Sequence, residues 1–210
     1  MKRKELNEIK RSHYEQCAIK RKRAYRACCY YECMLIDYAM IEDRLLAILS
    51  RVGFVQRVDD SNPGWSSKHR KERKAMLASV DRKYANTSPH IKNISTKIMA
   101  LRAVCDTDFA GLGFDDAYAS WLDKDVRKLF AECGVSSLCD RADEWRASRN
   151  TYVHALFGNV SYDTENEELK AFVDEGREIA LALNRVSGRM KTAEKKLKRR
   201  KAAEHRASRR

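Results

Sequence analysis

The residues best suited to chemistry in this 210-residue chain lie in the stretch 143–157, DEWRASRNTYVHALF. Its hydrophobic residues predict a helix, and within that helix stand three polar side chains, Arg149, Asn150 and His154. Asn150 and His154 are four residues apart and share one helical face. Arg149 and His154 are five apart, or roughly 140° around an α-helix. Arg149 must therefore reach round the helix, or two copies of the helix must meet and combine their residues.

These side-chain types could cleave RNA without a metal ion. A neutral imidazole can take the proton from a 2′-hydroxyl, and its cation can give one to the leaving oxygen. A guanidinium can hold the phosphate and offset the charge that builds on it, and an amide can orient either partner. The structural alternatives are a buried, hydrogen-bonded His154 and an ordinary ion pair between Arg149 and Glu144 or an acid of the first helix.

No competing catalytic or metal-binding pattern is present in the sequence. It lacks HExxH, GxSxG, a phosphate-binding loop and a CxxC pair, and none of its acids forms a paired metal motif with supporting context. We therefore expect no metal and no cofactor. The remaining histidines are scattered without metal-ligand spacing: His13, His69, His90 and His205.

The run RNTYVH, from Arg149 to His154, resembles the R-polar-x-x-x-H motif of the HEPN superfamily. The resemblance covers roughly residues 27–188 and implies a small antiparallel helical bundle. It also implies a metal-independent endoribonuclease, as in toxin–antitoxin, abortive-infection and type VI CRISPR antiviral systems. In such proteins two copies of the motif form one composite site, which implies a homodimer with Arg149, Asn150 and His154 as catalytic residues.

One position departs from the family pattern. HEPN toxins paired with nucleotidyltransferase antitoxins often carry a Tyr two residues after the His, where this chain has Leu156. Regulation by nucleotide addition there is therefore not expected. RNA is the expected partner, as substrate or as a stably bound non-coding RNA, and an antitoxin is a further candidate. The alternative functions are a non-catalytic RNA-binding module of a ribonucleoprotein and a helical partner-binding protein.

The net charge of +13 is concentrated at the two ends of the chain. Residues 1–26 carry 10 Lys or Arg against 3 acids, and residues 189–210 carry 11 against 2. Such ends suit a polyanion, and neither has the apolar face of a membrane-surface helix. RNA is thus favoured over a membrane, the alternative being solvated tails that only aid solubility. The candidate RNA-binding residues are Lys20, Arg21, Lys22, Arg23, Lys195, Lys196, Lys198, Arg199, Arg200 and Lys201.

Only 2 Pro and 8 Gly occur, which predicts an all-α protein with long helices. With the antiparallel helical bundle that the resemblance implies, the expected fold has a long N-terminal helix and basic helical extensions. The first helix is expected from Lys4 to Val52, with Gly53 as its stop. Asp37 and Glu42 on this helix are candidate supporting acids for Arg149 or bound RNA, and the alternative for Glu42 is a pair with a base. One apolar face is expected to hold Leu35, Tyr38, Leu45, Leu49 and Val52.

Further helices are expected over 68–84, after Ser88-Pro89, over 118–133 with Gly134 as its stop, over 136–157 and from about Glu165 into the basic end. The helix after Ser88-Pro89 is expected to carry an apolar stripe of Ile91, Ile94, Ile98, Leu101 and Val104. The expected domains are a basic extension at 1–26 continuous with the first helix, a HEPN-like domain at 27–188 and a basic tail at 189–210. The seven cysteines form no disulfide framework, and no signal or membrane span is evident. These features favour a cytoplasmic location.

Overall fold

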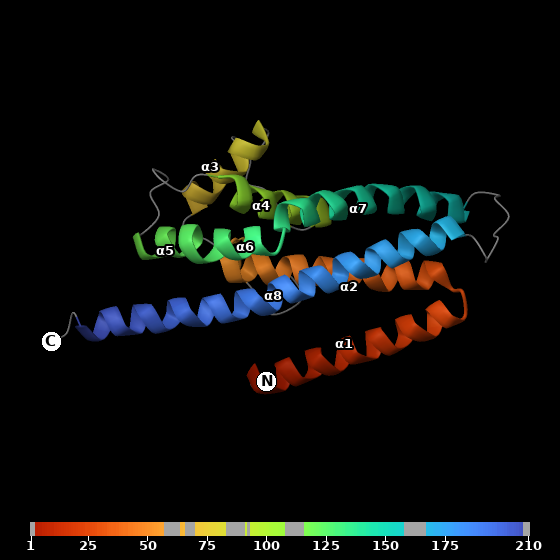
Figure 1. Cartoon of the computed structure of the whole chain (residues 1–210), viewed down its shortest axis with the longest axis horizontal. Helices are drawn as coiled ribbons and strands as arrows, with labels where there is room; N and C mark the ends of the chain where they lie inside the picture. Colours follow the sequence, from red (N-terminus) through yellow and green to blue (C-terminus); the bar gives the residue numbers. More distant parts are fainter. Residues whose placement is uncertain are drawn as a thin grey trace.

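The protein is an all-α helical bundle in the computed structural model, as the composition and helical patterns predict (Figure 1). The structure describes residues 3–56, 64–65, 70–82, 91, 93–107, 116–157 and 167–207. Among them, no helix has the length and apolar character needed to cross a membrane. The elements are α1 (Arg3–Arg26), α2 (Tyr30–Val52), β1 (Val55–Gln56), β2 (Gly64–Trp65), α3 (Arg70–Val80), α4 (Ile94–Asp106), α5 (Asp116–Trp121), the π-helix η2 (Leu122–Arg127), α6 (Lys128–Glu132), α7 (Val135–Phe157) and α8 (Glu167–Ala207), with β1 and β2 antiparallel.

The expectation of one continuous first helix is wrong, because the chain turns back between α1 and α2 (Figure 1). In this turn, Cys28 takes a left-handed conformation with φ of 56°. The backbone N–H of Cys29 donates to the carbonyl of Ala24 at 2.8 Å. Neither Gly nor Pro occurs in the turn, so the usual signal for a helix end is missing. The basic residues from Arg3 to Arg26 thus form a separate helix that packs on α2.

α2 is the central helix, packed along α8 and against α1 and α4. Leu45, Leu49 and Val52 of its predicted apolar face are fully buried. Leu35 of the same face is 54% exposed, because it lines an open groove between α1 and α2. Gly53 ends the helix as predicted, with φ of 90° and its N–H donated to the carbonyl of Leu49.

α4 begins later than expected. Asn93 caps it, accepting a hydrogen bond from the backbone N–H of Thr96 at 2.8 Å. The expected start, Ser88 and Pro89, lies outside the described residues. The helix predicted over 68–84 is described as α3. The predicted apolar stripe before and along α4 is buried: Ile91, Ile94, Ile98, Leu101 and Val104.

The helix predicted over 118–133 is present, but its middle is the π-helix η2. A π-helix is a wider helix that recurs at functional sites. The predicted stop, Gly134, has φ of 60° and separates α6 from α7. α7 then begins at Val135, one residue before the predicted start.

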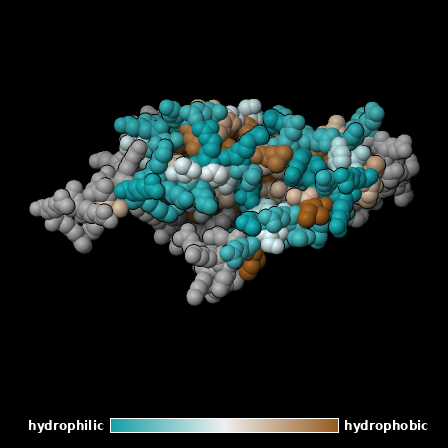
Figure 2. All heavy atoms as spheres, turned by 60° about the horizontal axis from the view of Figure 1, so that its bottom comes forward, coloured by the Kyte–Doolittle hydropathy of each residue, from teal (hydrophilic) through white to brown (hydrophobic). Residues whose placement is uncertain are grey.

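α8 is 41 residues long and continues into the basic C-terminal segment, as expected. Figure 1 shows its C-terminal part running past the other helices. Met190 is fully buried and Ala193 is 8% exposed, so the bundle includes the first turns of 189–210. The expected boundary at residue 189 is therefore too early. The face seen in Figure 2 is mainly hydrophilic, with a few separate hydrophobic patches.

Candidate functional site

The candidate catalytic residues lie on the C-terminal half of α7, which is fixed to the start of α8 by aromatic packing. Trp145 is 3% exposed and stacks on Phe172, with ring centroids 5.0 Å apart. Its indole N–H donates to the carbonyl of Phe172 at 2.9 Å. Gly176 allows this approach, because an added Cβ would lie 2.5 Å from the Trp145 ring. Tyr152 packs on the same phenyl ring, with ring centroids 4.6 Å apart.

Arg149 is half-buried and reaches across from α7 to α2. Its guanidinium carbon lies 4.1 Å from the ring centroid of Tyr38, in cation–π geometry. One terminal nitrogen donates to Oδ1 of Asn150 at 3.4 Å, while the buried Nε has no hydrogen-bond partner. Among the described residues Arg149 makes no ion pair, so the alternative pairing with Glu144 is not formed. The guanidinium is therefore held in place without its charge being neutralised.

Asn150 and His154 are exposed on the outer side of α7. The burial expected of a purely structural histidine is thus absent at His154. Within the described residues Arg149 contacts Tyr38 and Asn150 rather than His154. One chain accordingly brings Arg149 and Asn150 together and leaves His154 facing outward.

Asp37 does not contact Arg149, although the sequence suggested that it could orient this residue. It is fully buried and accepts two hydrogen bonds from Nε of Arg21, at 2.7 and 3.0 Å. Arg177 of α8 lies 3.9 Å from the same carboxylate. Burial raises the pKa of Asp37, and the Arg21 guanidinium opposes that rise. Asp37 is therefore a structural partner of Arg21 and Arg177.

Arg21 is consequently not an RNA-binding residue. Its side chain is buried, and its terminal nitrogen donates to the carbonyl of Val173 at 3.1 Å. Together with Asp37 it links α1, α2 and α8. The charge pattern of α1 could not show this, because Arg21 stands among basic residues that do face outward.

Glu42 pairs with a base, which was the structural alternative for this residue. Its carboxylate accepts a hydrogen bond from the ammonium of Lys97 at 2.6 Å, and the Lys97 side chain is only 5% exposed. This ion pair joins α2 to α4.

Most of the remaining candidate RNA-binding residues are exposed, and they form two groups at opposite ends of the bundle (Figure 1). One group lies near the α1–α2 turn, at the end of the bundle where α7 also ends. The other lies on the far part of α8, where Lys198 pairs with Glu194. The side chains of Arg200 and Lys201 lie outside the described residues. The exposed members are Lys20, Lys22, Arg23, Lys195, Lys196, Lys198 and Arg199.

Two features of the structure were not predicted from the sequence. Tyr38 was expected in the core, but its half-buried ring carries the guanidinium of Arg149. Nothing in the sequence links these residues, because they lie on different helices. The second feature is a cationic cleft that includes Lys124, Lys128 and Arg189. Its sequence signals were the spacing of four between the two lysines and the basic segment 189–210, which supplies Arg189 and the candidate Lys196.

Comparisons with protein-family models, with curated proteins and with solved structures found no match for this chain.

Proposed function

We propose that the protein is a metal-independent endoribonuclease of the HEPN type, with a composite site formed across a homodimer. The observation that carries the proposal is the guanidinium of Arg149. It is held on Tyr38 and bonded to the exposed Asn150, and no carboxylate of the described residues neutralises it. His154, one helical turn after Asn150, is also exposed.

Arg149 would bind the scissile phosphate. The Tyr38 ring packs on one face of the guanidinium, and the N–H groups of the guanidinium can donate to phosphate oxygens. A pre-positioned cation gains transition-state stabilisation without having to reorganise during the reaction. Asn150, already within hydrogen-bond distance of Arg149, would help to fix this orientation.

His154 would transfer protons. In the proposed step the 2′-oxygen attacks the adjacent phosphorus, and the bond from phosphorus to the 5′-oxygen breaks. A neutral imidazole takes the 2′-hydroxyl proton, and an imidazolium gives a proton to the departing 5′-oxygen. The products are a 2′,3′-cyclic phosphate and a 5′-hydroxyl.

A second subunit would supply the second imidazole, because α7 carries a single histidine, His154. Between Glu144 and Arg149 the exposed residues of α7 are the small Ala147 and Ser148, and Thr151, one turn further on, is also exposed. Small side chains let two helices approach closely, so two α7 helices could meet there about a two-fold axis. Arg149, Asn150 and His154 of both subunits would then share one site.

The expected setting is a toxin or an antiviral defence system, with RNA as substrate and with a non-coding RNA or an antitoxin as further partners. If RNA is bound and not cut, the protein is the non-catalytic RNA-binding module that was the alternative.

The test uses two versions of one RNA in buffer with EDTA, one all-ribose and one with 2′-deoxyribose at the mapped cleavage position. We expect cleavage of the first, with cyclic phosphate ends, and none of the second at that position. Equal cleavage of both, or activity that requires added metal, would refute the mechanism.

A further inference from the structure

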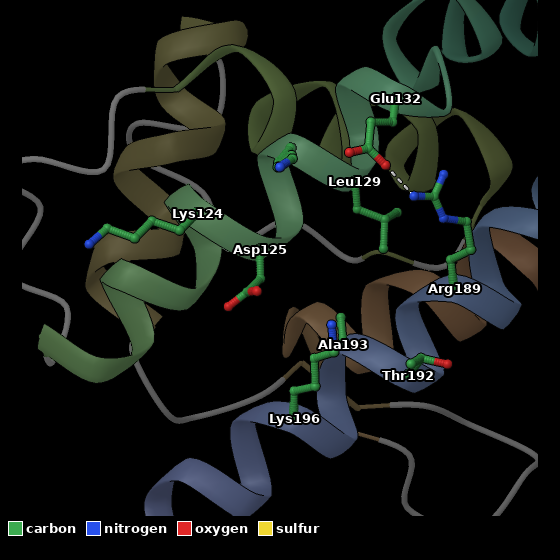
Figure 3. A pocket seen from close by; sticks show the side chains of 9 residues that line it. Lys124, Asp125, Leu129, Glu132, Arg189, Thr192, Ala193 and Lys196 are labelled. Carbon is green, nitrogen blue, oxygen red and sulfur yellow. Dashed lines mark hydrogen bonds and ion pairs between the residues drawn. The ribbon is translucent and has the colours of Figure 1, made fainter.

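A cationic cleft of about 460 Å³ lies between the η2–α6 segment and the distal part of α8 (Figure 3). Leu129 and Ala193 form an apolar floor and are 7% and 8% exposed. Figure 1 places this region at the opposite end of the bundle from the C-terminal end of α7. The cleft is thus separate from the candidate catalytic site at Arg149.

Two helical faces supply the charges of the cleft. Lys124 and Lys128 are four residues apart along η2 and α6, and Arg189 and Lys196 are seven apart on α8. Both spacings place side chains on one side of a helix. Figure 3 shows Lys124 extending outward at the rim, and Lys196 reaching along α8 beside Ala193.

Three of these four cations have no acidic partner in the part of the chain that the structure describes. Among the described residues Lys124, Lys128 and Lys196 make no ion pair. The lining also contains two acids, Asp125 and Glu132, so the cations exceed the acids by two. An anionic ligand would supply the missing negative charge.

Arg189 is held by Glu132 at the edge of the cleft (Figure 3). Its other terminal nitrogen donates to Sγ of Cys133 at 3.0 Å. The hydrogen bond to Glu132 raises the pKa of Arg189. The Arg189 side chain is about half exposed, so an entering anion can compete with Glu132 for it.

We propose that this cleft binds consecutive phosphate groups. Its volume lies within the roughly 300–1,000 Å³ of ligand sites, and ammonium and guanidinium groups are the usual phosphate-binding side chains. The phosphates could belong to an RNA backbone or to a nucleoside triphosphate. For RNA the inference rests on the proposed function, whereas for a nucleotide it stands alone.

The first test removes the unpaired charges by Lys124→Gln, Lys128→Gln and Lys196→Gln in one full-length variant. The control, Lys71→Gln, Lys74→Gln and Lys170→Gln, removes equal charge outside the cleft. Binding of a labelled RNA and of ATP is measured at several salt concentrations. For RNA we expect the slope of log affinity against log salt to fall by about 2 in the cleft variant, because each phosphate contact contributes about 0.7.

The second test increases binding and so cannot be mimicked by misfolding. Glu132→Gln removes one acid from the cleft and frees Arg189, so phosphate binding should become several-fold tighter. Glu178→Gln is the control, since it also removes an acid that pairs with an arginine, Arg141, but lies outside the cleft. It should change binding little.

The two ligands separate the two phosphate sources. Weakening of RNA binding alone assigns the cleft to an RNA backbone, and weakening of ATP binding alone assigns it to a nucleotide. A cleft variant that binds both ligands as its control does would overturn the proposal, even if the protein still cuts RNA. If the cleft variant loses binding while the wild type cuts no RNA, the cleft stands and the proposed catalysis fails.

Discussion

Arg149 and Arg21 stand in opposite electrostatic situations, although both contact residues of α2. Arg21 is buried and bonded to the carboxylate of Asp37. Within the described residues the Arg149 guanidinium contacts the Tyr38 ring and the Asn150 amide, and no carboxylate. Because a cation without a carboxylate partner can accept a phosphate at little cost, Arg149 is the better candidate for function. Arg21 is a structural residue.

Arg149→Ala should therefore abolish RNA cleavage with little effect on stability. We expect a loss of about 100-fold or more, as for removal of other charge-stabilising donors. Arg149→Lys keeps the charge but loses the planar fork, so it should behave nearly as badly. Single-turnover cleavage and thermal melting together check this. Unchanged cleavage in Arg149→Ala would remove the arginine from the mechanism.

Asp37→Asn, unlike Arg149→Ala, should cause a large loss of folding stability. Removing one partner leaves Arg21 buried without its counter-charge, which costs roughly 3–5 kcal/mol. Asp140→Asn is a matched control, since Asp140 is 58% exposed and pairs with Arg102 at the surface. That change should cost no more than about 1 kcal/mol. Urea unfolding of both variants measures the difference, and equal midpoints would contradict the structural role of Asp37.

At the scale of elements, the position of α7 depends on its contact with α8. Trp145 sits directly over Gly176, and any side chain at position 176 would collide with the indole. The same contact sets the distance between α8 and α7, the helix that carries Arg149 and His154. The glycine is therefore required by a close helix–helix approach.

Gly176→Ala should lower stability by roughly 1–3 kcal/mol through overpacking against Trp145. Gly188→Ala is the control within the same helix, because a Cβ there meets nothing within 4 Å. It should raise the free energy of unfolding by about 0.5–1 kcal/mol, since alanine favours helix. Shifts of the same sign for both variants would show that the Trp145 contact does not restrict position 176.

The sequence predicted elements where local signals exist. Gly53 and Gly134 end helices as expected, and the apolar stripe of α4 is buried. The turn at Cys28 and Cys29 could not be predicted, because α1 folds back through packing on α2 and no local signal marks the break.

At the candidate site, the sequence predicted which side chains could do chemistry but not their partners. Arg149, Asn150 and His154 lie on one helix, so their relative directions follow from helical geometry. The ring under Arg149 and the acid bonded to Arg21 come from other helices. Only the three-dimensional packing brings these residues together.

At the scale of the whole molecule, the two basic regions lie at opposite ends of the bundle (Figure 1). The group near the α1–α2 turn lies at the same end as the candidate catalytic residues of α7. The group on distal α8 lies beside the cationic cleft. An RNA that contacts both would have to run along the molecule and would reach the end where the candidate catalytic residues of α7 lie.

The composite site is the central claim, and a mixed dimer tests it most directly. Differently tagged subunits, one wild type and one carrying Arg149→Ala with His154→Ala, are co-expressed and purified as heterodimers. RNA cleavage is then measured in EDTA against the wild-type homodimer. If both subunits supply the acid and base of one site, the heterodimer should retain less than roughly a tenth of the activity, since one proton-transfer group contributes about 10²–10⁴-fold. Half of the wild-type activity would mean that each chain has its own complete site, and would contradict the account.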